Sequence, residues 1–197
     1  MMTTLLTIDA KKNADSSLVF SNISWTQFEA IATAFNEIAG VRLIYLDNVL
    51  EIMTLSPEHE ETKSTISVLI EAYLREIGLR FYVRGSATLG SREIGGQKEP
   101  DESYNLETKK AIPDLVIEVI FTSGAIDKLE LYRRIGIPEL WFWEDGVLQI
   151  YHLENEYQKV ESSRLLPHLD LALLKKYITY FDQYDAVTEF LQELRKR

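Results

Sequence analysis

Three side chains in the middle of the chain have the types and order that metal-dependent cleavage of a phosphodiester requires. Asp101 follows Pro100, Glu118 lies inside the apolar run LVIEVI, and Lys128 stands at the start of a helical segment. Carboxylate oxygens are ligands for a hard cation such as Mg²⁺, and a lysine beside them can orient or activate an attacking water. These residues make the chain a candidate nuclease.

Glu118 has apolar neighbours on both sides along an expected strand. Side chains alternate between the two faces of a strand, so Asp114 and Glu118 share one face. A carboxylate among apolar groups is costly unless it is paired, protonated or bound to a metal. Glu118 is therefore either a metal ligand or half of a structural salt bridge, for which Arg133 or Arg134 would be the partner.

Two Pro-Asp pairs compete to supply the second metal ligand. Asp114 precedes Glu118 by four residues on the same strand, roughly 13 Å away at the strand rise, which is too far for both to hold one ion. Asp101 can approach from a neighbouring strand or loop. We therefore take Asp101 as the ligand and Asp114 as a residue that caps the strand entry.

Lys128 and His59 complete the candidate site. Lys128 is expected on the inner face of its helix, where its amine would point toward Glu118. Without the other site residues, Lys128 would be interpreted as an ordinary exposed lysine. His59 lies at the start of a helix, where it could be a third metal ligand, a general base or a phosphate contact. The alternative for His59 is a purely structural role. Asp127, beside the lysine, is expected to serve the helix N-terminus.

Local signals place these residues on alternating helices and strands. Ser24 and Gln27 form a capping-box pattern, and Asp47-Asn48 is typical of a hairpin turn. Helical patterns cover 25–39, 57–77, 127–135, 169–178 and 185–197, and strand patterns cover 41–55 as a hairpin, 80–85, 86–91, 113–120, 138–153 as a second hairpin and 157–160. The polar stretch 94–110 is expected to be a brief strand or a mobile loop.

The strand, helix and strand around Glu118 predict a crossover unit, and hence an α/β (α+β) fold. We expect a central mixed β-sheet flanked by helices, with an N-terminal helix plus β-hairpin. Residues 1–20 look like a flexible N-terminal arm, and 21–197 form a single domain, which suits the chain length of 197 residues.

Composition narrows the choice of function. The chain is 46% hydrophobic and 26% charged, which is typical of a globular protein. It has no cysteine, which excludes disulfides, thiolate zinc sites and cysteine nucleophiles. Neither a signal peptide nor a run of about 18 apolar residues is evident, so we expect a cytoplasmic protein without a membrane span.

The net charge of −10 argues against a general binder of polyanions. It does not exclude a nuclease, because catalytic carboxylates and an acidic outer face can coexist with a local basic groove. The basic residues of the segment leading to Asp101 are the candidates for phosphate contact: Arg75, Arg80, Arg84, Arg92 and Lys98.

Four blocks in order resemble the PD-(D/E)XK nuclease superfamily, and within it the Uma-two family of restriction-type endonucleases. They are IMTLSPEHE, EPDESY, IPDLVIEVI and DKLELYRRIGIPELWFWEDGVLQIYHL, and the resemblance spans roughly residues 20 to 175. The last block is the most specific, because a helix, a glycine, a proline and an aromatic strand arrive together.

The resemblance implies a restriction-endonuclease-like core and phosphodiester hydrolysis with Mg²⁺, or Mn²⁺ as a substitute, held by Asp101 and Glu118. The lysine of the superfamily usually stands two residues after the glutamate, where this chain has Ile120. Lys128 on the following helix would take its place, with His59 assisting. The implied substrate is nucleic acid, DNA rather than RNA, and cutting two strands would suit a homodimer.

Two other functions remain open at this point. One is a nuclease-fold protein that no longer cuts and instead binds a protein partner, which the acidic charge and the missing Glu-x-Lys lysine favour. The other is a metal-dependent hydrolase of a different phosphate ester, such as a nucleotide, which would need a closed pocket. A retained Mg²⁺ or Mn²⁺ site would favour an enzyme over the binding protein.

Overall fold

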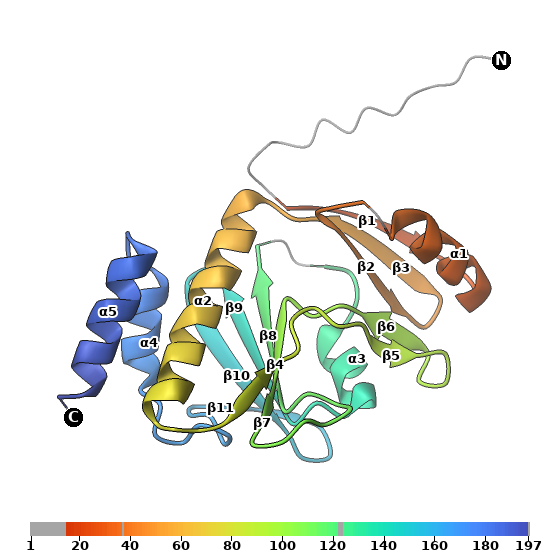
Figure 1. Cartoon of the computed structure of the whole chain (residues 1–197). Coiled ribbons are helices and arrows are strands. Elements are labelled where there is room, and N and C mark those ends of the chain that lie inside the picture. The colour runs from red at the N-terminus through yellow and green to blue at the C-terminus, as the bar shows by residue number, and fades with distance from the viewer. Residues whose placement is uncertain (1–14, 37, 122–123, 197) are drawn as a thin grey trace.

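The computed structural model describes residues 15–36, 38–121 and 124–196. These residues contain two β-sheets and five helices (Figure 1). The helices are α1 (Trp25–Phe35), α2 (Pro57–Glu76), α3 (Lys128–Ile135), α4 (Leu171–Ile178) and α5 (Gln183–Leu194). The strands are β1 (Ser16–Ser21), β2 (Val41–Leu46), β3 (Val49–Thr54), β4 (Phe81–Val83), β5 (Leu89–Ser91), β6 (Gly96–Lys98), β7 (Glu102–Leu106), β8 (Leu115–Ile120), β9 (Glu139–Glu144), β10 (Val147–Leu153) and β11 (Tyr157–Val160). None of the described helices is long and apolar enough to cross a membrane.

The larger sheet has six strands in the order β11-β10-β9-β8-β7-β4. β8 and β9 are parallel and are joined through α3, whereas the other neighbouring pairs are antiparallel. The predicted crossover and the central mixed sheet are therefore confirmed. β8 lies inside this sheet and is buried along almost its whole length, as its β-branched run predicts.

The smaller sheet has five antiparallel strands in the order β1-β3-β2-β6-β5. β2 and β3 form the predicted hairpin, and both residues of its turn, Asp47 and Asn48, have positive φ. The expectation of a flexible arm over residues 1–20 is wrong for its last part. Residues 1–14 lie outside the described residues, but β1 pairs along β3 from Ser16 to Ser21, because its backbone completes the edge of that hairpin.

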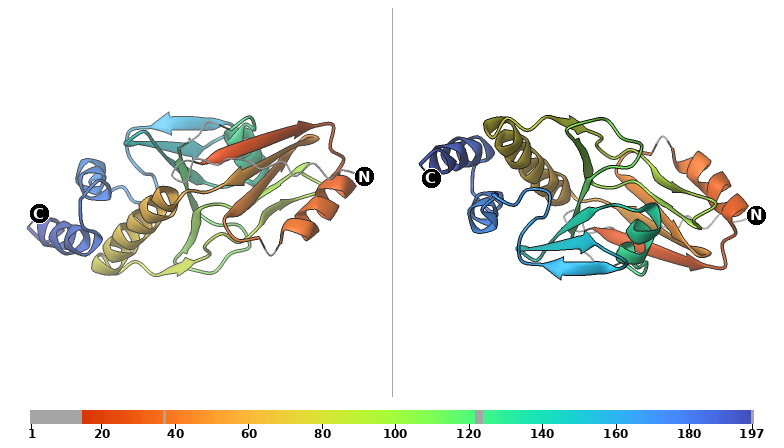
Figure 2. Two further views of the ribbon diagram at one scale, coloured as in Figure 1. Left: turned by 90° about the horizontal axis from the view of Figure 1, so that it is seen from above. Right: turned by 90° about the horizontal axis from the view of Figure 1, so that it is seen from below.

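The two sheets and the helices form layers. One face of the six-stranded sheet, with Leu115, Ile117 and Val119 of β8, packs against α2, α4 and α5. The opposite face, with Val116, packs against α3 and the five-stranded sheet. α1 covers the outer face of the five-stranded sheet through Phe28. Figure 2 shows α1 and the α4–α5 pair at opposite ends of the molecule.

Capping residues set the start of each helix near the site. Ser24 and Gln27 form the predicted capping box of α1. That helix ends at Phe35, before the predicted end at Gly40, and leaves Ile38 exposed. Asp127 caps α3 as predicted, and α3 stops at Gly136, which has φ 86° and suits the left-handed cap.

The polar stretch 94–110 contains two strands, β6 and β7, instead of a brief strand or a mobile loop. β6 pairs with β2 in the smaller sheet, and β7 pairs with β8 in the larger one. The chain therefore passes from one sheet to the other between Lys98 and Glu102. This passage places Lys98 and Asp101 on opposite sides of the junction between the sheets. Thr122 and Ser123, which follow β8 in the sequence, lie outside the described residues.

Candidate active site

Glu118 lies at the centre of the candidate site, on the face of β8 that meets the smaller sheet. Its side chain is 1% exposed. Lys98 Nζ of β6 lies 2.5 Å from Oε2, and Lys128 Nζ of α3 lies 3.4 Å from the same oxygen. The Tyr132 hydroxyl of α3 donates to Oε1. Three side chains from two elements, β6 and α3, thus converge on one buried carboxylate.

The alternative in which Glu118 forms a salt bridge with Arg133 or Arg134 is wrong. Both arginines pair with Glu130 on their own helix, and Arg134 also binds Asp47. Their positions near the end of α3 turn them toward the helix surface, whereas Lys128 and Tyr132 share the inner face one turn apart. The partners of Glu118 are therefore two ammonium groups and a phenol, and not a guanidinium group.

The two lysines differ in their electrostatic setting. Burial lowers the pKa of Lys98, and the neighbouring ammonium of Lys128 lowers it further, against the attraction of Glu118. Burial also lowers the pKa of Lys128, but Glu118 and Asp101 outweigh burial, so its pKa is raised. Lys98 is 3% exposed and Lys128 is 10% exposed. Lys128 is therefore the more accessible and the more firmly protonated of the two.

Asp101 stands beside Glu118 at the start of β7. Its Oδ2 accepts a hydrogen bond of 2.8 Å from the backbone N–H of Val119, the residue after Glu118. His59 Nε2 lies 3.2 Å from Oδ1, which is an ion-pair distance without the angle of a hydrogen bond. Burial opposes the charge on Asp101, but His59 and Lys98 outweigh it and lower the pKa of Asp101 to about 2. Asp101 is therefore a carboxylate at neutral pH.

His59 links Asp101 to a second buried acid, Asp15. His59 Nδ1 lies 2.8 Å from Asp15 Oδ2, and Asp15 Oδ1 accepts the backbone N–H of Ser56 at 2.7 Å. Burial lowers the pKa of His59, yet the two carboxylates outweigh burial and raise it. The imidazole thus lies between two acids and holds Asp101 in place. Asp15 was missed by the sequence analysis, because it falls in the segment taken for an arm.

A small recess lies where these side chains meet. The residues of the candidate site that line it are His59, Lys98, Asp101, Glu118 and Lys128, together with side chains of the smaller sheet. Its volume is about 10 Å³, close to the least space that holds one water molecule. Within the described ranges no group of three or more His, Cys, Asp or Glu side chains is arranged to hold a metal ion. Of the described side chains that line the recess, the carboxylates of Glu99, Asp101 and Glu118 and the imidazole of His59 are of the types that bind metal ions.

Glu51 is a further buried acid on the inner face of the smaller sheet. Strand register places Glu51 opposite Ile44, and Ile44 opposite Lys98, so all three share that face. Glu51 is 0% exposed, and neither carboxylate oxygen has a hydrogen-bond partner in the part of the chain that is described. A Cβ on Gly124 would come within 2.8 Å of both oxygens, so the Glu51 carboxylate would have to shift if that glycine were replaced.

The four predicted catalytic residues, Asp101, Glu118, Lys128 and His59, therefore gather around one recess. Asp114 lies apart from them, as expected. Its Oδ2 accepts the N–H of Leu106 at 2.8 Å, and Lys110 pairs with its carboxylate. Asp114 thus fixes the entry of β8.

Lys98 and Tyr132 are site residues whose roles the sequence analysis missed. Lys98 had been grouped with arginines as a phosphate contact, but it is buried against Glu118. One signal was available, since Lys98 precedes Asp101 by three residues and stands just before a proline-containing turn. Tyr132 could have been found from its position one helical turn after Lys128.

Comparison with known proteins identifies the family of the chain. Residues 25–178 match the model of the Uma2 family, whose description is "Putative restriction endonuclease". A solved structure with similarity to this chain is that of "a putative nuclease belonging to DUF820" from Anabaena variabilis ATCC 29413, at 14% identity and a TM-score of 0.38, over 76% of this chain and 90% of that one. No curated protein matches. Because the family model covers more than half of the sequence, the chain belongs to the Uma2 family of nucleases.

Proposed function

We propose that the chain is a metal-dependent endonuclease that hydrolyses phosphodiester bonds of DNA at the Asp101–Glu118 recess. The observation that carries the proposal is the convergence on one buried carboxylate, Glu118, of two lysines from different elements beside a second carboxylate. Buried acids and lysines that meet around a recess of water size suit a charged substrate group and an attacking water.

The donor set fits Mg²⁺. This ion commonly takes one or two carboxylates and keeps several waters, so Asp101 and Glu118 meet its minimum requirement. Asp101 is ionised at neutral pH and is fixed by Val119. When bound, Mg²⁺ would polarise a phosphate oxygen and lower the pKa of a bound water. The ammonium groups of Lys98 and Lys128 occupy positions next to the Glu118 oxygen that faces the recess.

The two lysines divide the remaining work. Lys128, the more accessible, orients the attacking water and stabilises the negative charge that develops on the phosphate. Lys98, almost fully buried, holds the Glu118 carboxylate in its orientation. Tyr132 fixes the second oxygen of Glu118. His59 acts through Asp101, which it positions together with Asp15.

The test is cleavage by the purified wild-type protein and by Asp101→Asn, Glu118→Gln and Lys128→Ala. The substrates are supercoiled plasmid, linear duplex, single-stranded DNA and RNA, each with Mg²⁺, Mn²⁺ or EDTA. Both carboxylate variants are expected to lose metal-dependent cutting, and Lys128→Ala to lose about 100-fold or more. Lys175→Ala changes an exposed lysine on α4 and serves as the matched control. Cutting that persists in both carboxylate variants would refute the site.

A second candidate function is a family member that binds a protein partner without cutting. The observation that favours it is that both oxygens of Glu118 already have protein partners. Calorimetric titration of the wild-type protein with MnCl₂ separates the two functions. Binding that disappears in Glu118→Gln supports the nuclease, whereas the absence of both binding and cleavage supports the non-cutting protein.

A further inference from the structure

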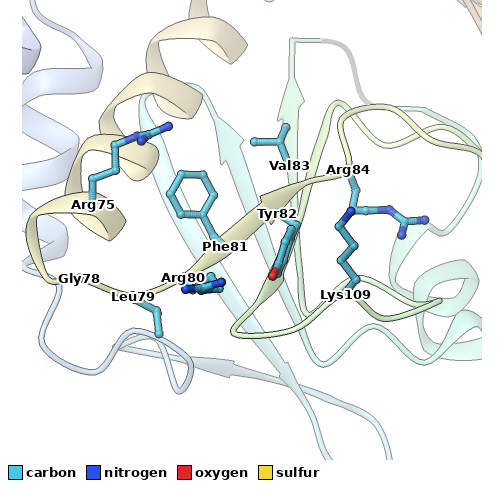
Figure 3. Close-up of a pocket in the computed structure, with 9 residues that line it drawn as sticks. All are labelled: Arg75, Gly78, Leu79, Arg80, Phe81, Tyr82, Val83, Arg84 and Lys109. Atoms are coloured by element: carbon cyan, nitrogen blue, oxygen red, sulfur yellow. The ribbon is translucent and has the colours of Figure 1, made fainter.

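A basic groove lies along the free edge of the six-stranded sheet, where β4 is the last strand. Its volume is about 910 Å³, and it runs between the end of α2 and the loop after β7 (Figure 3). Four cationic side chains, Arg75, Arg80, Arg84 and Lys109, line the groove, and no Asp or Glu does. In a chain of net charge −10, this is a local excess of positive charge.

None of these four cations forms an ion pair with any described residue. Basic residues just outside the groove are paired: Lys110 binds Asp114, and Arg195 binds Glu76. The groove therefore keeps its cations available to an anionic ligand, while the surrounding surface neutralises its own.

Two aromatic rings hold cations of the groove in place. The Arg75 guanidinium lies 5.4 Å from the ring centroid of Phe81, and Lys109 Nζ lies 5.4 Å from that of Tyr82. Arg84 Nη1 donates to the carbonyl of Lys110 at 3.1 Å, which restrains its head group. Figure 3 shows Arg84 and Lys109 side by side at one end and Arg75 at the other. Cations restrained in this way lose less entropy when they bind.

The groove begins near the candidate active site and extends away from it. The N–H of Arg84 donates to the carbonyl of Ser103, two residues after Asp101. At the far end, Arg75 follows His59 by sixteen residues on α2, which is roughly 24 Å at the helical rise. A single strand with about seven phosphates spans this distance from His59, at the candidate site, to Arg75. Cations at both ends of the groove suit an extended polyanion better than a single phosphate.

We propose that this groove binds the phosphate backbone of DNA on one side of the bond to be cut. The inference rests on the proposed nuclease function and adds the surface that retains the substrate. Regularly spaced phosphates supply the negative charge that the four cations lack, and guanidinium groups bind phosphate oxygens through paired N–H donors. The acidic remainder of the surface would then repel DNA elsewhere and confine it to this edge.

The test compares two triple variants with the same change of charge. The groove variant is Arg80→Glu/Arg84→Glu/Lys109→Glu, and the control is Lys159→Glu/Lys175→Glu/Lys196→Glu, which changes exposed lysines on other surfaces. Binding of fluorescein-labelled single-stranded and duplex DNA is followed by anisotropy in EDTA, at several salt concentrations. We expect the groove variant to bind at least about 30-fold more weakly, and its salt slope to fall by about 1 for each phosphate that the groove no longer neutralises.

The control variant is expected to lose less affinity than the groove variant at every salt concentration. Equal losses in the two variants, or none in either, would overturn the proposal. Thermal unfolding checks that the groove variant is folded, and Arg80→Gln/Arg84→Gln/Lys109→Gln should show a smaller loss in the same direction. A wild-type protein that binds an acidic polypeptide such as poly-glutamate through these residues, but not DNA, would also overturn it.

The groove assignment and the proposed nuclease function can be refuted independently of each other. Binding is measured in EDTA, so it does not depend on cleavage. If the groove variant binds DNA as the wild type does while Glu118→Gln abolishes cutting, the groove assignment falls and the nuclease stands. If the wild type binds DNA but never cuts it, and the groove variant loses that binding, the groove assignment stands and the proposed catalysis falls.

Discussion

Lys98 and Glu118 connect the two sheets of the molecule through a buried ion pair. Lys98 belongs to β6 of the five-stranded sheet and Glu118 to β8 of the six-stranded sheet, with 2.5 Å between Nζ and Oε2. Their side chains are 3% and 1% exposed. Because an unpaired buried charge is far costlier than a paired one, each residue makes the burial of the other tolerable. The pair therefore ties the formation of the site to the packing of the sheets.

Replacing Lys98 by Met should destabilise the protein strongly. Breaking a buried pair from one side costs about 3–5 kcal/mol, and we expect the lower end, about 3 kcal/mol, because Lys128 and Tyr132 still contact Glu118. Urea unfolding at pH 7 measures the loss. The double variant Lys98→Met/Glu118→Gln, which removes both charges, should regain most of the stability. Equal urea midpoints for Lys98→Met and the exposed control Lys175→Met would contradict the prediction.

Short-range chemistry explains what the sequence could predict of the fold. The run around Glu118 could only be a buried strand, the turn at Asp47-Asn48 accepts positive φ, and Gly136 ends α3 in the left-handed conformation. Each signal acts within a few residues. Asp101, Glu118, Lys128 and His59 could be grouped because their residue types restrict the chemistry and the family resemblance set their order.

Long-range pairing explains what the sequence could not predict. β6 has only three residues, and it is a strand because β2 and β5 pair with it. Lys98 is buried for the same reason, since the second sheet closes over it. Asp15 looked like part of a loose segment, but His59 and the N-terminus of α2 bind its carboxylate. A polar residue in a polar stretch carries no local sign of such burial.

Glu51 and Glu139 are both fully buried glutamates, and their neutralisation should have opposite effects. Glu139 accepts hydrogen bonds from the Trp141 indole, the Ser163 hydroxyl and the backbone N–H of Arg164. Glu51 has no hydrogen-bond donor among the described residues. Glu51→Gln removes a buried carboxylate that accepts no hydrogen bond from the described residues, so the free energy of unfolding should rise by about 1 kcal/mol or more. Glu139→Gln weakens an acceptor that has hydrogen-bond donors, so it should lower the free energy of unfolding.

Thermal unfolding of the two variants at pH 7 tests this contrast. For a chain of this size, about 1 kcal/mol corresponds to a shift of about 2–4 °C in Tm. Glu51→Gln should melt above the wild type and Glu139→Gln below it. A lower Tm for Glu51→Gln would show that the carboxylate has a stabilising partner, for which the ammonium of Lys128 is the candidate, since Glu51 contributes to its raised pKa.

Arg134 fastens α3, the helix that carries Lys128, to the hairpin of the smaller sheet. Its guanidinium binds both carboxylate oxygens of Asp47 at 2.7 and 2.6 Å and Glu130 Oε1 at 2.7 Å. Hydrogen bonds from Arg133 and Arg134 lower the pKa of Glu130 to about 2, and the hydrogen bond from Arg134 lowers that of Asp47. The groups are solvent-facing, so Arg134→Ala should cost only about 1 kcal/mol at pH 7.

The pH dependence of that cost follows from the sign of the shifts. Carboxyl groups whose pKa is lowered by folding stabilise the folded protein when the pH lies above their pKa in the unfolded chain. That pKa is 4.5 for Glu130 and 3.8 for Asp47. This stability is lost as the pH falls from there toward about 2, because protonation removes the charge that Arg134 binds. Urea midpoints of wild type and Arg134→Ala should therefore differ at pH 7 and at pH 5, differ less at pH 3 and converge toward about pH 2. A difference that stays constant or widens on acidification would mean that Arg134 stabilises α3 through packing of its side chain and not through these carboxylates.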